Sequence, residues 1–241
     1  MNTQIQESYN LYINGQWVPA SDGKTFKAYN PANGDVLSTC AEATKEDVDT
    51  AVAAAHEALR TWRLVEPIER QKILLKIADI IDENKEHLAM IETLDNGKPI
   101  RETLNVDIPA AADHFRYFAG AIRTQEGRAV MLDNNTMSIV LHEPIGVVGQ
   151  IVPWNFPFLM AAWKLAPVLA AGCTTVIKPS SSTSLSVLEL MRLIGDVVPA
   201  GVINVITGKG SKSGQYLLCK SSPLRVQQKS AVAYTRLQWI N

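Results

Sequence analysis

The alternation of strand-like and helix-like segments in residues 146–205 constrains the fold more than any other feature of this sequence. A mostly apolar run from Gly146 to Val152 suits a strand that is buried on both faces. After it come a helical segment at 158–170, a β-rich run at 174–177, a helical segment at 184–197 and a short strand at 203–205. This βαβαβ order predicts an α/β fold built on a doubly wound parallel sheet.

The residues before this region predict a small β structure followed by helices. Tyr12–Val18 places Asn14-Gly15 between β-forming residues, which indicates a hairpin because a type I′ turn needs two positive φ angles. Thr44 and Asp47 resemble a capping box at the start of a helix. Helical periodicity then predicts four helices, of which one follows Thr44, one opens at Pro67, one runs to Leu94 and one spans 107–122.

Residues 128–143 change to a period of two, with two β-like runs on either side of Asp133-Asn134-Asn135. This pattern predicts a hairpin between two helical regions, placed as an arm that pairs with another element. Residues 219–241 contain lysines and arginines but no acidic residue, and they show no clear period. We therefore divide the chain into 1–124, the arm at 125–143, the sheet region at 144–218 and a divergent tail at 219–241.

Composition excludes several classes of protein. A net charge of −1 argues against a partner that is a nucleic acid. No signal peptide is expected at the N-terminus, and Lys164 and Pro167 interrupt the longest apolar stretch, so we expect no membrane span. Three scattered cysteines and four scattered histidines show no metal-ligand spacing, so we expect no metal and a cytoplasmic location.

Candidate chemistry lies in the segments that follow the predicted parallel strands. Ligands of α/β sheets bind at the carboxyl ends of the strands. Three segments, Pro153–Pro157, Lys178–Ser182 and Thr207–Gly214, should therefore converge. Neither a G-x-G-x-x-G fingerprint nor a P-loop occurs among them.

Each candidate residue has two interpretations. The Asn155 amide could donate a hydrogen bond to an oxyanion, worth about 3–4 kcal/mol, or simply cap the following helix, which spacing alone favours. Lys178 could bury its stem and offer an exposed ammonium to a ribose hydroxyl or phosphate, or be an ordinary strand-end lysine. Gly208, Gly210 and Gly214 could permit close approach of the backbone to a ligand, or they could simply belong to an ordinary surface turn.

Two potentially reactive side chains are interpreted as inert. Cys173 lies between Ala-Ala-Gly and a β-rich run, where we expect a small buried thiol. His114 has no sequence neighbour suited to acid–base chemistry. Trp62, Phe115 and Phe118 are expected in the core.

Several of these segments together resemble the aldehyde dehydrogenase superfamily. The most specific is Pro144–Pro157, which contains Pro-Trp-Asn-Phe-Pro, and it is followed by Trp163–Pro167 and Val176–Pro179. The resemblance covers about residues 9–218, with further agreement at Tyr12–Val18, Tyr29–Pro31, Leu94–Pro99 and Gly201–Val205.

The resemblance implies an atypical Rossmann-like domain that binds NAD or NADP without the glycine fingerprint. Asn155 would then stabilise a thiohemiacetal oxyanion, which reverses the preference for a cap. Lys178 would bind the adenosine ribose, and the turn Gly208–Gly214 would lie beside the adenine. The nicotinamide-ribose side would be lined by Ile151, Val152, Pro153 and Trp154.

The resemblance also implies an activity and a mode of assembly. Family members oxidise an aldehyde substrate to a carboxylic acid: a cysteine thiolate attacks, hydride passes to NAD(P)⁺, and glutamate-activated water releases the acid. The hairpin at 125–143 would be an oligomerisation arm, which predicts a homo-oligomer or pairing with a longer relative.

Two departures from the family pattern matter. Ser181 stands where NAD-preferring members commonly carry a glutamate that holds the ribose 2′-hydroxyl, so we expect NADP to be tolerated. The Phe-Thr-Gly-Ser, Glu-Leu-Gly-Gly and nucleophilic-cysteine motifs do not occur, and Cys219 lies too early to substitute. We therefore expect the N-terminal half of an enzyme without its catalytic domain, with a tail that arose by frameshift or divergence.

Three functions remain open from the sequence. The chain could be an aldehyde dehydrogenase that is catalytically incomplete. It could instead be a non-enzymatic fragment that binds nucleotide or pairs with a partner. A degenerate product that does not fold stably is the third alternative, because a truncated sheet would expose an apolar face and an unpaired edge.

Overall fold

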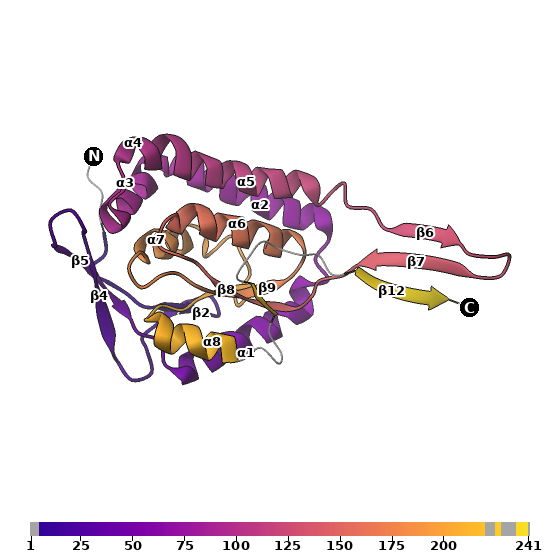
Figure 1. Cartoon of the computed structure of the whole chain (residues 1–241), viewed down its shortest axis with the longest axis horizontal. Helices are drawn as coiled ribbons and strands as arrows, with labels where there is room; N and C mark the ends of the chain where they lie inside the picture. The colour runs from indigo at the N-terminus through magenta and orange to yellow at the C-terminus, as the bar shows by residue number, and fades with distance from the viewer. Residues whose placement is uncertain (1–4, 220–224, 228–234, 241) are drawn as a thin grey trace.

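The computed structural model describes residues 5–219, 225–227 and 235–240, which form a body with one projecting arm (Figure 1). The centre of the body is a six-stranded sheet in the order β11-β8-β9-β10-β2-β3. Its strands are β11 (Arg225–Gln227), β8 (Val147–Ile151), β9 (Thr174–Lys178), β10 (Ile203–Val205), β2 (Leu11–Ile13) and β3 (Gln16–Val18). The first four are parallel, and three of them, β8, β9 and β10, are the strands that the βαβαβ pattern predicts; β2 and β3 extend the sheet antiparallel.

The predicted N-terminal hairpin is confirmed. Asn14 and Gly15 both adopt positive φ angles, 52° and 77°, as a type I′ turn requires. The Asn14 N–H donates to Oδ1 of buried Asn204 at 2.9 Å, which ties the turn to β10. A smaller sheet lies beside it, with β5 (Val36–Ala41) between β1 (Ser8–Tyr9) and β4 (Thr25–Tyr29).

Helices cover both faces of the large sheet. Helices α1 (Lys45–Trp62) and α8 (Gln215–Cys219) lie on one face, and α6 (Pro157–Ala170) and α7 (Leu185–Ile194) on the other (Figure 1). An outer layer of helices packs against α6 and α7. That layer comprises α2 (Pro67–Glu83), α3 (Lys85–Asn96), α4 (Ile100–Glu102), the π-helical turn η1 (Thr103–Asp107) and α5 (Ile108–Ala121).

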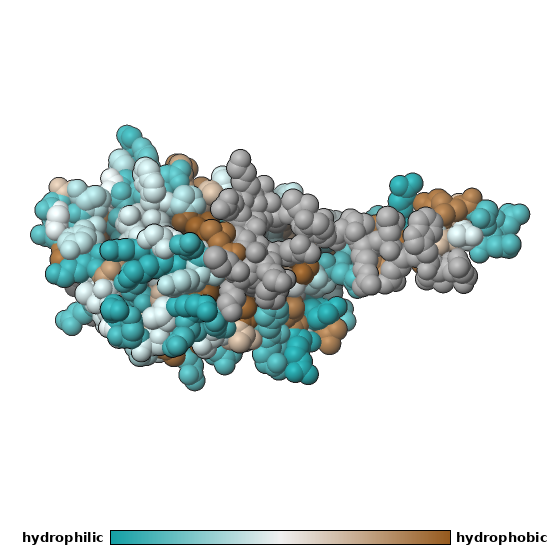
Figure 2. All heavy atoms as spheres, turned by 60° about the horizontal axis from the view of Figure 1, so that its bottom comes forward, coloured by the Kyte–Doolittle hydropathy of each residue, from teal (hydrophilic) through white to brown (hydrophobic). Residues whose placement is uncertain are grey.

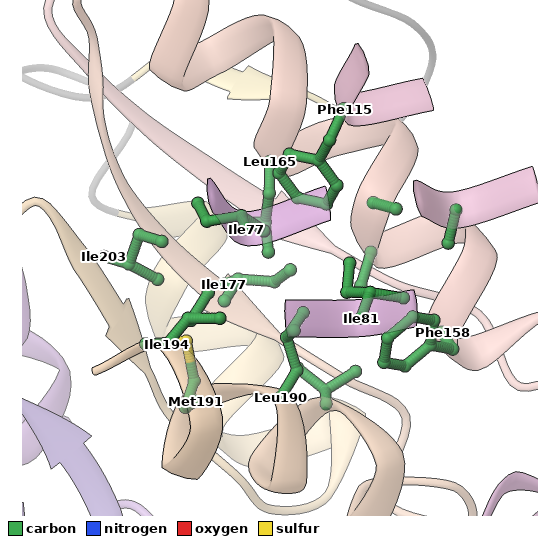
Figure 3. Packing of buried hydrophobic residues seen from close by; sticks show 14 of the residues in the cluster. Ile77, Ile81, Phe115, Phe158, Leu165, Ile177, Leu190, Met191, Ile194 and Ile203 are labelled. Atoms are coloured by element: carbon green, nitrogen blue, oxygen red, sulfur yellow. The ribbon is translucent and has the colours of Figure 1, made fainter. Parts of the chain in front are cut away.

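The main apolar core lies between α6, α7 and this outer layer. Ile77 of α2, Phe115 of α5 and Leu165 of α6 meet Ile177 of β9 there, all fully buried (Figure 3). Trp62 is also buried, as expected, whereas Phe118 is only partly buried at the edge of the cluster. Such burial contributes about 25 cal/mol per Å² of apolar surface removed from water.

Most predicted boundaries agree with the structure. The capping box at Thr44 and Asp47 is confirmed, since each side chain accepts from the other's backbone N–H. The helix expected to reach residue 197 ends at Ile194 instead, where the Gly195 N–H donates to the Met191 carbonyl. None of the helices in the described part of the chain is long and apolar enough to cross a lipid bilayer.

The hairpin expected within 125–143 forms the arm. Strands β6 (Arg128–Met131) and β7 (Met137–His142) pair antiparallel and project from the body (Figure 1). Apolar side chains are exposed along it (Figure 2). They are Met131, Leu132, Met137 and Leu141.

Two strands occur in the tail at 219–241, to which the sequence analysis assigned no element. Strand β11 pairs parallel with β8, and β12 (Thr235–Ile240) pairs antiparallel with β7 of the arm. Strand β11 has three residues, too few to show a period in the sequence.

Candidate functional site at the strand carboxyl ends

The three segments singled out in the sequence meet at one edge of the sheet. Ile151 at the end of β8 lies in register with Lys178 at the end of β9, and the Val152 N–H donates to the Lys178 carbonyl at 3.0 Å. The Ile206 N–H donates to the Ile177 carbonyl at 3.0 Å, which places the end of β10 alongside. The loops that follow β8, β9 and β10 therefore leave the sheet together.

The loop after β8 exposes the candidate amide. Pro153, Trp154 and Asn155 are all exposed. Phe156 holds the N-cap position of α6, with φ −141° and ψ 66°, and no side chain caps that end. Asn155 is therefore not the helix cap, and that interpretation of the sequence is wrong.

Residues of α3 and the turn after it hold this loop on both sides of Asn155. Nδ2 of Asn96 donates to the Trp154 carbonyl at 2.6 Å. Nζ of Lys98 lies 3.4 Å from the centroid of the Phe156 ring, a cation–π contact, and pairs with buried Asp107 at 2.5 Å. The sequence marks Leu94–Pro99 only by its resemblance to the family and does not predict these contacts, because they join residues far apart in the chain.

Two buried carboxyl groups of α3 bind the beginnings of the neighbouring helices. Oε1 of Glu92 accepts from the Phe158 N–H of α6 at 3.2 Å, and Oδ2 of Asp95 accepts from the Leu185 N–H of α7 at 2.8 Å. Burial raises the pKa of Glu92 to about 7 and that of Asp95 to about 8. Both acids are well placed to satisfy N–H groups at helix starts, yet both lack water to stabilise a full charge.

Lys178 is more deeply buried than the sequence predicts. The expected exposed ammonium is wrong: the residue is 2% exposed, and its Nζ donates to the Pro179 carbonyl at 2.8 Å. Burial lowers the pKa of this lysine to about 8. The bond to Pro179 uses one of the three ammonium hydrogens, and Gly214 lies beside the stem, 3.5 Å from Cδ to a Cβ built on the glycine.

The three candidate glycine positions differ in whether they could accept a side chain. Gly208 has a φ of +132°, and an added Cβ would lie 2.8 Å from Oγ of Ser213, so a side chain is excluded there. An added Cβ at Gly210 meets nothing within 4 Å. Ser181 lies half-buried in the turn after β9.

The two residues interpreted as inert, Cys173 and His114, pack against other side chains in the folded protein. Cys173 is buried, and burial raises the pKa of its thiol, as expected for a small core residue. His114 contacts the rings of Phe118 and Trp163, and burial lowers its pKa. Over the described residues, no three His, Cys, Asp or Glu side chains form a group that could hold a metal ion.

The parallel sheet and its clustered strand-end loops define a Rossmann-like α/β protein. The family model for the aldehyde dehydrogenase family matches residues 17–226. The chain belongs to this family. This match ends at residue 226, within β11, and so extends beyond residue 218, the end of the resemblance seen in the sequence.

Individual relatives agree with this assignment. An aldehyde dehydrogenase of Vibrio cholerae serotype O1 is 55% identical over 213 residues, which is 88% of this chain and 42% of the relative. An NAD⁺ complex of an aldehyde dehydrogenase from Bacillus cereus is 40% identical with a TM-score of 0.86, covering 90% of this chain and 47% of that one. An indole-3-acetaldehyde dehydrogenase mutant of P. syringae, in complex with NAD⁺ and IAA, is 36% identical with a TM-score of 0.86, covering 90% and 44%. This chain thus spans less than half the length of these relatives.

The buried acids of α3 predict a pH-dependent stability. Because the folded-state pKa values of Glu92 and Asp95 lie above their ordinary values, their stabilising contribution is complete below about pH 4 and is lost as pH rises through about 7 and 8. The free energy of unfolding should fall by about 1–3 kcal/mol per group between pH 6 and 9.

Chemical denaturation across this pH range measures the effect. Glu92→Gln and Asp95→Asn keep an oxygen acceptor for the helix N–H but cannot ionise, so each should flatten the pH dependence. Glu86→Gln, on the exposed face of the same helix, is the matched control and should leave the wild-type slope unchanged. Equal slopes in all four proteins would contradict the assignment.

Proposed function

We propose that this chain binds NAD or NADP at the carboxyl ends of β8, β9 and β10 and presents Asn155 as the oxyanion donor of an aldehyde-oxidising site. The observation that carries this proposal is the register of Ile151 with Lys178, which sets the Asn155 loop beside a buried ammonium. The NAD⁺ complexes among the structurally similar aldehyde dehydrogenases support it.

The residues around the strand ends suit a dinucleotide. Lys178 keeps ammonium hydrogens beyond the one donated to Pro179, and these suit a ribose hydroxyl. Gly214 leaves the lysine stem uncovered by a side chain, and the turn from Gly208 through Gly210 offers its backbone to the adenine. Ile151, Val152, Pro153 and Trp154 would line the nicotinamide-ribose side.

NADP should be accepted as well as NAD. The half-buried residue at the ribose position is Ser181, whose hydroxyl can donate or accept a hydrogen bond. It brings no negative charge to repel a 2′-phosphate. Cofactor choice at this position therefore rests on other charged groups nearby.

The chemistry assigned to the site is oxidation of an aldehyde. The nicotinamide, when bound, supplies a hydride acceptor. The exposed Asn155 amide can donate to an oxygen that becomes negatively charged when a nucleophile attacks the aldehyde carbonyl. Asn96 and Lys98 fix the loop segments on either side of that amide. We further propose a cytoplasmic location, which suits the free buried thiols of Cys40 and Cys173.

Nucleotide binding gives the first test. Saturating NAD⁺ should raise the melting temperature, since a ligand at 100 times its Kd stabilises by about 2.7 kcal/mol. Lys178→Met keeps the buried stem but loses the donor, so affinity should fall at least tenfold. Lys72→Met, on the exposed face of α2, is the control. An unchanged melt with both nucleotides, or full affinity in Lys178→Met, would refute the proposed site.

Turnover gives the second test. The sequence holds no motif for the family's nucleophilic cysteine or general-base glutamate, and Cys40 and Cys173 are buried. We therefore expect this chain alone to form no NAD(P)H when an aldehyde and NAD(P)⁺ are added, followed by absorbance of the reduced nicotinamide. Turnover that disappears in Asn155→Ala would show that the chain is catalytically complete.

The arm supports a second role, association with another copy of the chain or a longer relative. Four exposed apolar side chains on the arm favour it, because burying such side chains against a partner is energetically favourable. Light scattering should show a dimer or larger species. Met131→Asp with Leu132→Asp should dissociate it, whereas Leu64→Asp on the body should not. A monomer at all concentrations would exclude the role.

A further inference from the structure

A buried acid lies against the turn that follows β10, and none of the roles above uses it. Glu42 comes directly after β5, and its N–H donates to the Lys24 carbonyl at 2.8 Å. The next residue, Ala43, donates its N–H to the Thr207 carbonyl at 2.9 Å. Cγ of Glu42 then lies 3.3 Å from a Cβ built on Gly208, so the acid contacts the start of the turn.

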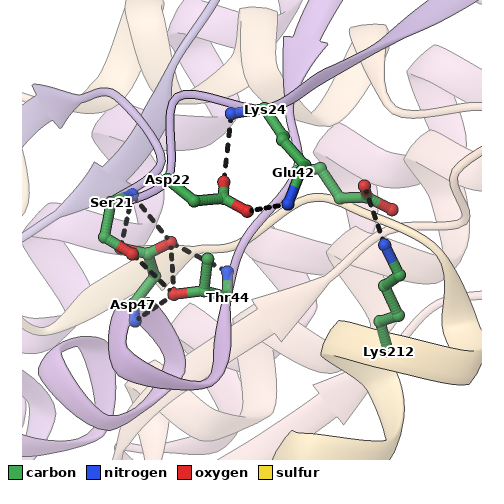
Figure 4. Close-up of polar contacts among 7 residues, drawn as sticks. All are labelled: Ser21, Asp22, Lys24, Glu42, Thr44, Asp47 and Lys212. Atoms are coloured by element: carbon green, nitrogen blue, oxygen red, sulfur yellow. Dashed lines mark hydrogen bonds and ion pairs between the residues drawn. The ribbon is translucent and has the colours of Figure 1, made fainter.

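The carboxylate of this acid has an ion-pair partner at one of its two oxygens. Glu42 is 9% exposed, and its Oε2 pairs with Nζ of Lys212 at 3.3 Å (Figure 4). Its other oxygen, Oε1, is buried and has no hydrogen-bond partner within the described residues. The neighbouring Lys24 is paired with Asp22 at 2.8 Å. Lys212 is therefore the ion-pair partner of Glu42, and Lys24 attracts the same carboxylate without pairing with it.

Lys212 is able to serve a second anion. Its side chain is 52% exposed, whereas that of Glu42 is 11% exposed, so the ammonium lies at the surface end of the pair. A lysine presents a compact charge on a flexible stem with three donors, and one carboxylate oxygen uses only part of that capacity. The pair thus combines a buried carboxylate with a largely exposed ammonium that can change its position.

The same turn reaches the proposed nucleotide site. It begins at Gly208 against Glu42 and ends at Gly214 against the stem of Lys178, with Lys212 between the two glycines. The Glu42–Lys212 pair therefore shares one short loop with the lysine assigned to the adenosine ribose. A ribose bound at Lys178 would therefore lie at the other end of the turn that carries Lys212.

We propose that the Glu42–Lys212 pair sets the preference between NADP and NAD. This inference rests on the proposed nucleotide binding and supplies the charged groups that Ser181 does not. Lys212 is the cation that meets a 2′-phosphate, and Glu42 opposes that phosphate both by its own charge and by holding Lys212. The attraction by Lys212 and the repulsion by Glu42 partly cancel, so wild type accepts both cofactors. Removing the charge of Lys212 should favour NAD, and removing that of Glu42 should favour NADP.

Calorimetric titration of the full chain with NAD⁺, NADP⁺ and 2′,5′-ADP tests the pair. Lys212→Gln should weaken NADP⁺ and 2′,5′-ADP about fivefold while changing NAD⁺ less than twofold, as expected for loss of one screened charge near a phosphate. Glu42→Gln should strengthen NADP⁺ by about threefold to tenfold for the converse reason. Lys209→Gln, an exposed lysine of the same turn, is the control and should leave the NADP⁺ to NAD⁺ ratio within twofold.

The outcomes separate this inference from the proposed function. Suppose that wild type binds NAD⁺ or NADP⁺ but neither Lys212→Gln nor Glu42→Gln changes the ratio of the two affinities. The proposed role of the pair is then overturned, and the proposed nucleotide site stands. Binding of no nucleotide by the folded wild type overturns both. Thermal melts of the ligand-free variants verify folding, and half-exposed Lys212 keeps the test decisive if the buried substitution at Glu42 destabilises the protein.

Discussion

The site depends on two carboxyl groups that lie outside the sheet. The first N–H groups of every helix lack partners within that helix, and the starts of α6 and α7 are buried under the outer layer. Glu92 and Asp95, three residues apart on α3, supply an acceptor to each. The loops that carry Asn155 and Ser181 run directly into these two helices. Helix α3 therefore fixes the point at which each loop ends and its helix begins.

This arrangement places opposing demands on the same residues. A carboxylate satisfies helix N–H groups best when it is charged, yet burial without a paired cation favours the neutral acid. Lys178 faces the reverse demand, because a buried ammonium favours loss of its proton. The strand-end region therefore contains acids and a base whose charges are all costly, as is common where a protein prepares a polar surface for a ligand.

Local chemistry explains which parts of the fold were predictable. The turn at Asn14-Gly15, the capping box at Thr44 and the parallel strands β8, β9 and β10 each follow from residues adjacent in sequence. The acceptor role of Glu92 was not predictable, because its partner lies 66 residues away. The burial of the Lys178 head group was missed for a related reason: Pro179 supplies a carbonyl whose direction only the folded backbone defines.

The position of β11 has a consequence for how the chain reaches this structure. Strand β8 carries the Asn155 loop, and in the described part of the chain its edge opposite β9 pairs with β11, which follows β8, β9 and β10 in the chain and is synthesised after them. Until β11 has emerged from the ribosome, that edge of β8 exposes unpaired backbone N–H and C=O groups. The edge of the sheet beside the Asn155 loop is thus closed only after the other three parallel strands have been synthesised, and the growing chain is most open to intermolecular strand pairing before that moment.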